Sequence, residues 1–333
     1  MPAAAQNVLV DAILDAFQDS GTSGVLLSGA TRHPRRFLVQ TETGSVEIWV
    51  YIWTLTHGGR PSLPDEYRVQ MTTVASPLPI NPRGYTVLLG YEPNHKMFAG
   101  FDLHRHRTFT AGSPSVQIDI KCVHKALQDG LAFDRKSNDE IAVGIRPDQL
   151  VSYVANAEDL HRFGSTALMF RLLTKASALE DLAEVEVAKL PEKRKRIVAT
   201  VNRLSRAACF RQMVLSAYTN RCAVTRMQLR LIDAAHILPV GVEGSTDNVQ
   251  NGIALSPTYH RAFDNGLIFL DEDLKMRLNP VKEIHLKTLR LDGGLPDFRN
   301  LLDRRIHLPP DKRQWPSPDV IRKANSFRRI PAP

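Results

Sequence analysis

The sequence predicts an α+β protein with three parts: a strand-rich N-terminal domain (residues 1–165), a helical connector (166–204) and a C-terminal domain (205–333). Short β-branched and aromatic runs separated by Gly, Pro and Asn clusters dominate the first part. Helical periodicity and a dense run of charge follow, and then a strand, loop, strand and helix pattern. A chain of 333 residues is long enough for two domains that each bury a core.

Composition and charge indicate a globular protein with an uneven surface. Hydrophobic residues make up 43% of the chain and charged residues 23%, as in ordinary globular proteins. Residues 1–165 carry 15 Lys and Arg against 17 Asp and Glu, whereas residues 166–333 have a net charge of +10. Such an excess is typical of nucleic-acid contact, although a solvated surface explains it equally well.

The N-terminal run and the cysteines indicate the cellular compartment. Asp11 and Asp15 interrupt the first apolar run, unlike a signal peptide, and no apolar run approaches the ~20 residues of a membrane helix. Cys122, Cys209 and Cys222 are odd in number and far apart, which excludes a disulfide framework and a four-cysteine zinc site. We expect a cytoplasmic protein without a membrane partner.

The N-terminal domain is expected to form a curved sheet or partial barrel. Val10, Ile13 and Phe17 can share one face of an opening helix over 7–18. Short helices are expected over 121–129 and 148–155. Strands are expected where β-branched and aromatic runs lie between turn residues, at 36–40, 46–55, 67–73, 85–91, 97–104, 116–120 and 141–145.

Two short motifs of this domain resemble those of one class of nucleases. Pro64-Asp65 and Asp119-Ile-Lys121 match the tripeptides of PD-(D/E)XK nucleases. Their separation is wide and such tripeptides are common, so a chance match is favoured. His104 and His106 alternate on an expected strand, where exposed polar positions are favoured over a metal pair.

Two features of this domain are weak candidates for contact with nucleic acid. The segment Trp49-Val-Tyr-Ile-Trp53 alternates bulky rings, which form either core packing or an aromatic cage for an extruded modified base. Basic residues in loops are the other candidate. The slightly negative net charge of the domain argues against a broad basic surface that contacts the phosphate backbone, so only local contacts are expected. They are Arg32, Arg35, Arg36, Arg60, Arg105 and Arg107.

Helical character is expected from about residue 165 to 218, with one helix over 176–188 and, after the charge-rich 190–196, a long helical stretch to 218. The basic residues of this connector form either a stripe that contacts the phosphates of a nucleic acid or a solvated helix face. The solvated face is the commoner role of a run of charged residues. The candidates for DNA contact here are Arg203, Arg206 and Arg211.

The C-terminal pattern begins with an expected strand over 230–236, followed by a loop rich in Gly and Asp and a second strand over 253–255. Ser256 is a favourable N-cap and Pro257 suits the first position of a helix. Gly266 is suited to end that helix.

Chemically active residues gather in this pattern. His260 and Asp264 are four residues apart on the expected helix, so both can reach one divalent cation. His236 ends the first strand and can deprotonate water, because imidazole with its ordinary pKa is a base at neutral pH. Asn251 is suited to hold the intervening loop through hydrogen bonds to the backbone.

These segments resemble an HNH endonuclease of the predicted bacterial restriction-enzyme branch, over about 205–278. The resemblance implies a ββα-metal fold and hydrolysis of DNA to 5′-phosphate and 3′-hydroxyl ends. By this resemblance the general base is His236, the loop asparagine Asn251 and the metal-binding helix residue His260, and Asp264 takes the place of a second metal histidine. The matching runs are Phe210-Arg-Gln-Met-Val-Leu-Ser-Ala-Tyr, Arg221-Cys-Ala-Val-Thr, Ala234-Ala-His-Ile-Leu-Pro, Asp247…Asn251-Gly-Ile-Ala-Leu and His260…Phe263-Asp-Asn-Gly-Leu.

The chain departs from the family pattern in two ways. The Cys-x-x-Cys pairs that hold structural zinc in many members correspond to Cys222/Thr225 and Ser256/Tyr259, so no structural zinc is expected. The position before the general base, often a further metal ligand, is Ala235. Asp264 is therefore more important as a possible metal ligand. Helix capping or an ion pair with Arg261 nevertheless explains an aspartate at this position about as well as metal ligation does.

The combined prediction is a restriction endonuclease that cuts double-stranded DNA with Mg²⁺, or with Mn²⁺, and takes sequence or modification specificity from its N-terminal domain. Two alternatives are a non-catalytic DNA-binding protein with a decayed HNH core, which Ala235 makes conceivable, and a toxin-like nuclease. With one site per chain, cutting both strands needs a homodimer or two sequential nicks. The DNA-contacting candidates of the C-terminal half are Arg203, Arg206, Arg211 and Arg261.

Overall fold

The computed structural model describes residues 4–41, 44–110, 112, 114–163 and 166–330. The chain separates into two packed units, Met1–Ala208 and Cys209–Pro333. Both helices and strands are present, so the α+β prediction is confirmed. The predicted three-part division stays a prediction. The described part of the chain contains no helix with the length and apolarity needed to span a membrane.

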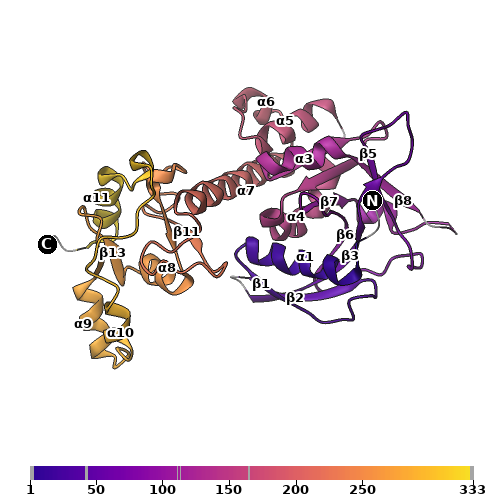
Figure 1. The fold of residues 1–333 in the computed structure, drawn as a ribbon. Helices are drawn as coiled ribbons and strands as arrows, with labels where there is room; N and C mark the ends of the chain where they lie inside the picture. The colour runs from indigo at the N-terminus through magenta and orange to yellow at the C-terminus, as the bar shows by residue number, and fades with distance from the viewer. Residues whose placement is uncertain (1–3, 42–43, 111, 113, 164–165, 331–333) are drawn as a thin grey trace. The chain divides into compact units, whose positions relative to one another are not determined.

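A seven-stranded sheet is the main element of the N-terminal unit (Figure 1). Its strands are β1 (Ser23–Leu26), β2 (Arg35–Thr41), β3 (Gly44–Thr54), β6 (Tyr85–Glu92), β7 (Met97–Phe101), β9 (Leu131–Arg135) and β10 (Ile141–Ile145). They follow the order β1-β2-β3-β6-β7-β10-β9, and all neighbours are antiparallel except β3 and β6. All residues of β10 are buried, as expected of a strand that is covered on both faces.

The two faces of this sheet pack against different layers. Ile48, Val50 and Ile52 of β3 face a core shared with helices, whereas Tyr51 and Trp53 face a core shared with a second sheet, because successive side chains of a strand point to opposite faces. The helices of the first core are α1 (Gln6–Asp19), α4 (Leu150–Phe163), α5 (Ala167–Ser177) and α7 (Glu192–Ala217). The second sheet consists of β4 (Thr56–His57), β5 (Glu66–Gln70) and β8 (Ser115–Asp119). Residues of β5, β8 and α3 (Ile120–Asp129) contribute to the second core.

Two expected elements of this unit differ in the structure. The strand expected over 97–104 ends at Phe101, because Asp102 caps the short helix α2 (Leu103–His106) by accepting the N–H of Arg105. The helix expected over 176–188 is largely absent: α5 ends at Ser177, Leu179 follows in the left-handed region (φ 57°), and α6 covers only Glu184–Ala188. Strands β1, β4 and β9 were not expected from the sequence pattern.

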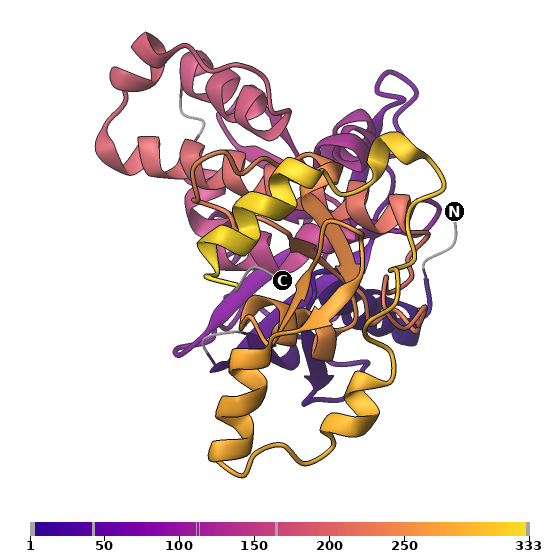
Figure 2. The same cartoon turned by 90° about the vertical axis from the view of Figure 1, so that its left-hand side faces the viewer.

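The C-terminal unit begins within α7 and contains the expected strand, loop, strand and helix. Its further elements are β11 (Asp233–His236), β12 (Gly252–Leu255), α8 (Pro257–Asp264), β13 (Ile268–Leu270), β14 (Met276–Leu278), α9 (Pro280–Thr288), α10 (Leu295–Arg299) and α11 (Pro318–Phe327). Figure 2 shows α11 lying across β13. Phe210, Val214, Phe263 and Ile321 are buried in one core, so α7, α8 and α11 pack on the same strands.

Candidate active site

The candidate site lies where β11, β12 and α8 meet. In the antiparallel β11–β12 pair, His236 lies opposite Gly252 and Asp233 opposite Leu255. A Cβ atom on Gly252 would lie 2.2 Å from Cγ2 of Val214, so only glycine permits α7 to pack this closely on the strand pair. The same helix then brings Phe210 next to His236.

His236 is held as a neutral base. Its ring stacks on that of Phe210, with 3.7 Å between centroids and 11° between planes. Its Nε2 lies 3.1 Å from Oδ1 of Asp247. Burial lowers the pKa of His236 and Asp247 partly offsets this effect. Because a carboxylate only accepts hydrogen bonds, Nε2 carries the proton and Nδ1 is the basic atom.

Asn251 holds the loop between the two strands. Its side chain is buried, and its Oδ1 accepts the N–H of Leu238 at 2.8 Å. Its Nδ2 donates to the carbonyls of Leu238 and Thr246 at 3.1 and 2.8 Å and contacts the hydroxyl of Ser245 at 3.2 Å. These bonds fix the loop that carries Asp247, and hence the partner of His236.

Replacing Asn251 with alanine is expected to destabilise the C-terminal unit by about 2–3 kcal/mol, because buried backbone groups lose their partners. Amide hydrogen exchange in β11 and β12 measures this loss in the C-terminal unit alone. Asn265→Ala is the matched control, since Asn265 is exposed and its side chain donates only to the carbonyl of Arg261. Equal protection in the two variants would contradict the assigned role of Asn251.

His260 lies between two carboxylates. Its Nδ1 is 3.3 Å from Oδ2 of Asp233 and its Nε2 is 3.2 Å from Oδ2 of Asp264. The hydrogen bonds to Asp233 and then Asp264 raise the pKa of His260 to about 9. Burial raises the pKa of Asp233, but His260 and Arg211 hold it below its usual value. Without a metal His260 is therefore a cation at neutral pH.

Arg211 has a different environment from the one expected of a DNA contact. Its Nη1 lies 3.4 Å from Oδ1 of Asp233, and its Nη2 donates to the carbonyl of Ile232 at 3.2 Å. Arg211, Asp233, His260 and Asp264 thus form one chain of polar contacts. The other three arginines proposed to contact DNA are exposed: Arg203 and Arg206 in the N-terminal unit and Arg261 on α8.

Charged residues of α8 act electrostatically on His236. The charge of Asp264 raises the pKa of His236 and the charge of His260 lowers it, so β11 and α8 bring the two histidines into the same charged region. The sequence did not identify Asp233, Asp247 or Phe210 as partners, although Asp247 and Phe210 lie within the runs that resemble the family. One feature of the sequence could have identified Asp233 as a partner: it is an acidic residue within the short strand that ends at His236.

The fit of a divalent cation rests on His260 and Asp264. No group of three or more His, Cys, Asp or Glu side chains within the described ranges is arranged to hold a metal. The His260–Asp264 pair nevertheless offers an imidazole nitrogen and a carboxylate oxygen, a donor set that divalent transition ions and Mg²⁺ accept. At the zinc-cysteine positions of other family members, Cys222 accepts the N–H of Thr225 at 3.4 Å and contacts the hydroxyl of Ser256.

The aromatic segment of the N-terminal unit is core. Tyr51 and Trp53 are buried, and they donate to the carbonyls of Pro79 and Thr72. The cage hypothesis is therefore wrong for these two rings, because their face of β3 is covered by the second sheet. Trp49 is partly buried and donates to Glu47.

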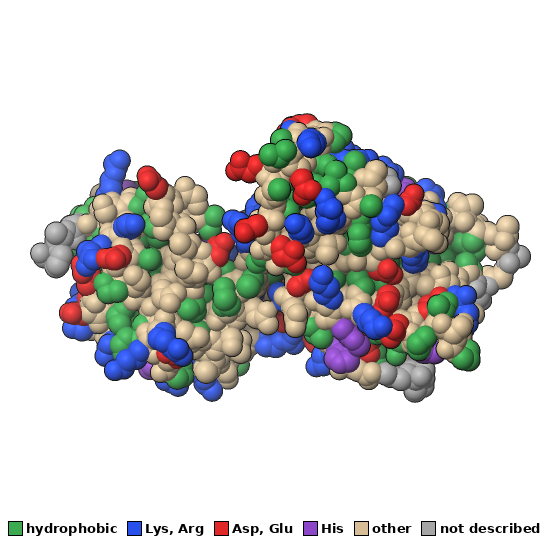
Figure 3. Space-filling view, turned by 90° about the horizontal axis from the view of Figure 1, so that it is seen from above, with side chains coloured by type: hydrophobic (Ala, Val, Ile, Leu, Met, Phe, Trp, Pro, Cys, Tyr) green, Lys and Arg blue, Asp and Glu red, His purple; other side chains and the backbone are tan. Residues whose placement is uncertain are grey.

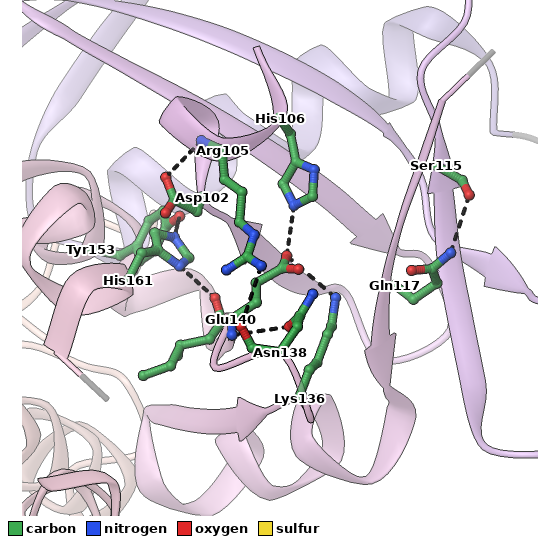
Figure 4. A network of polar contacts seen from close by, with 11 residues as sticks. Asp102, Arg105, His106, Ser115, Gln117, Lys136, Asn138, Glu140, Tyr153 and His161 are labelled. Carbon is green, nitrogen blue, oxygen red and sulfur yellow. Dashed lines mark hydrogen bonds and ion pairs between the residues drawn. The ribbon is translucent and has the colours of Figure 1, made fainter. Parts of the chain in front are cut away.

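The histidine pair of this unit is not on a strand. Figure 4 shows His106 on α2 directed toward Glu140, with 2.6 Å between Nε2 and Oε1. His104 has a separate acidic neighbour, Glu158, at 3.9 Å. The expectation of alternating positions on a strand is wrong, because Asp102 begins a helix there.

The PD-(D/E)XK-like residues do come together. Glu66 of β5 lies opposite Asp119 of β8, and Asp65 forms an ion pair with Lys121. Asp119 caps α3 by accepting the N–H of Lys121 at 2.8 Å. Each side chain thus has a local structural role.

Arg35 cannot contact DNA, contrary to the sequence-based suggestion. It lies on the core face of β2, is fully buried, and donates from Nε to the carbonyl of Ala30 at 2.8 Å. Arg36 and Arg60 form ion pairs with Glu47 and Glu66. On the face shown in Figure 3, basic and acidic side chains are interspersed.

Part of each unit matches a known protein family. Residues 222–271 match the family described as HNH endonuclease, and residues 46–154 match the family described as methylase-associated X1. No curated protein matches the chain significantly. A solved structure described as a modification-dependent TagI restriction endonuclease is similar over 87% of this chain and 82% of its own, with 14% identity and a TM-score of 0.30. The protein therefore contains a methylase-associated X1 domain in its N-terminal unit and an HNH endonuclease domain in its C-terminal unit.

Proposed function

We propose that this protein is a restriction endonuclease that hydrolyses phosphodiester bonds of double-stranded DNA with a divalent metal ion. One observation carries the proposal. A neutral His236, oriented by Asp247, and the His260–Asp264 pair belong to the same HNH domain. The description of the N-terminal family as methylase-associated supports a restriction setting, because restriction enzymes act beside methylation that protects host DNA.

His236 would act as the general base. Its Nδ1 accepts a proton from water as the oxygen attacks phosphorus. Asp247 stabilises the imidazolium that forms, since its carboxylate already holds the Nε2 proton. Phe210 keeps the ring in one orientation. Phosphoryl transfer depends mainly on position and charge, so a fixed base contributes directly to the rate.

His260 and Asp264 would hold the metal, for which we propose Mg²⁺, with Mn²⁺ as an alternative. HNH nucleases generally use a divalent metal, whose charge offsets that of the phosphate and the leaving oxygen. Asp233 orients the His260 ring through Nδ1, and Arg211 in turn holds Asp233. Such outer contacts fix the direction of a metal-binding imidazole.

Ala235 does not favour the alternative of a decayed core. Its side chain is buried in the hydrophobic core of the C-terminal unit. Since neighbouring residues of a strand point to opposite faces, this position faces away from the side of His236. The lack of a ligand atom at Ala235 is therefore compatible with a working site.

Digestion of matched unmodified and modified phage DNAs tests this function. We expect cutting by the wild-type chain, no cutting by His236→Ala, and products with 5′-phosphate ends in end sequencing. Preference for one DNA would assign modification specificity to the N-terminal domain. DNA retention on gels without cleavage under any divalent metal would support the non-catalytic alternative instead.

Chelation is expected to abolish cleavage, and Mg²⁺ or Mn²⁺ is expected to restore it. The structural reason is that the metal-free site pairs the His260 cation with two carboxylates, Asp233 and Asp264, so it has no net positive charge to offset that of the leaving oxygen. Calorimetric titration of the metal-free protein with Mn²⁺ gives a second readout, in which His260→Ala should weaken binding at least tenfold. Full activity in excess chelator would exclude the metal-dependent mechanism.

A further inference from the structure

Arg328 is the first residue after α11 and lies far outside the matched HNH segment, residues 222–271. The helix is fixed on the HNH core, because Ile321 and Ala324 are buried there and Asn325 donates to the carbonyl of Leu270 at 2.9 Å. The position of Arg328 is therefore set by packing of the C-terminal helix.

The guanidinium of Arg328 bridges the two segments that carry the candidate site. Its Nη1 donates to the carbonyl of Ile237 at 2.6 Å, one residue after His236. Its Cζ lies 4.6 Å from the ring centroid of Phe263, one residue before Asp264. The backbone contact and the ring face together fix the plane of the guanidinium.

This cation has no acid in ion-pair contact within the described chain. Burial lowers the pKa of Arg328, and the charge of Asp264 acts in the opposite direction without a direct contact. Nε and Nη2 make no hydrogen bond to the described residues and are not fully enclosed. A half-buried guanidinium that pairs with no carboxylate, and whose Nε and Nη2 are free to donate hydrogen bonds, is suited to bind an anionic ligand.

We propose that Arg328 binds a phosphate group of DNA at the HNH site, a role that rests on the proposed function. The fixed fork of the guanidinium matches two phosphate oxygens. The site would then receive positive charge from Arg328, at the end of the C-terminal helix, as well as from a metal held by His260 and Asp264. The HNH domain of this chain is thus completed by a residue some sixty positions beyond the family match.

The test measures binding of a DNA duplex to full-length protein as a function of salt concentration. Each variant is made in the His236→Ala background with Ca²⁺, so that no cleavage occurs. Loss of one phosphate contact lowers the slope of log K against log salt by about 0.9. We expect this decrease for Arg328→Met, and a slope close to the parent for Arg328→Lys. Arg322→Ala is the matched control, because Arg322 lies on α11, six residues before Arg328, and pairs with Glu272 and Asp319.

Cleavage by variants that keep His236 gives the second readout. Arg328→Met is expected to lower the single-turnover rate about 10- to 100-fold, and ethylguanidinium to restore part of it, which a purely structural role would not allow. An unchanged salt slope and rate in Arg328→Met would overturn the proposal for Arg328 alone. Failure of the wild-type chain to bind duplex DNA would overturn the proposed function and the role of Arg328 together.

Discussion

His236→Ala is expected to lower the rate of DNA cleavage by a factor of about 10²–10⁴, the usual contribution of a general base. The reason is that no other described side chain has the same combination of a low pKa, a stacked ring and a carboxylate on its second nitrogen. Single-turnover cleavage of a defined duplex under saturating Mg²⁺ measures the chemical step without product release.

The matched control for this variant is His285→Ala. His285 is exposed on α9 and lies outside the candidate site, so its loss should leave the cleavage rate unchanged. Thermal unfolding of both variants separates loss of the base from loss of the fold. A folded His236→Ala protein that cuts at the wild-type rate would remove His236 from the mechanism.

The stability of the metal-free protein is expected to fall as the pH rises from about 6.5 to 9. His260 has its ordinary pKa of 6.5 in the unfolded chain and a pKa of about 9 in the folded one. A group with a raised folded pKa stabilises fully below its unfolded pKa and loses that contribution as the pH passes its folded pKa. Since one pKa unit corresponds to about 1.4 kcal/mol, the contribution is at most about 3.5 kcal/mol.

Urea unfolding in excess chelator at pH 6, 7.5 and 9 measures this contribution. Asp264→Asn should reduce the pH dependence, because it removes one of the two carboxylates that raise the pKa of His260. His285→Ala should retain the dependence seen in the wild-type protein. A stability that is constant over this range would contradict the charged state of His260 in the metal-free site.

The local parts of the fold could be predicted because neighbours in sequence are neighbours in space there. The apolar run 141–145 was expected as a strand and is β10, and the spacing of His260 and Asp264 on a helix placed them 3.2 Å apart. Gly266, with φ 67°, follows α8 as the turn chemistry predicted.

The sequence-based predictions were wrong where tertiary packing decided which face of a strand a side chain occupies, or whether a segment forms a strand or a helix. Tyr51 and Trp53 have the alternation of a strand, but the sequence does not say that a second sheet covers their face. Arg35 similarly lies on the core face of β2. His104 lies in a run with strand-like composition, and the cap formed by Asp102 determined a helix instead.

The sequence by itself determined which residues are the candidates for the HNH site, because the motif is compact and its spacing sets which side chains share a strand end or a helix face. Only the tertiary structure determined what surrounds them. Asp247 reaches His236 through the loop held by Asn251, and Arg328 reaches Ile237 across 91 positions of the chain. Such contacts depend on how α7 and α11 pack on the two strands, and no local pattern specifies that packing.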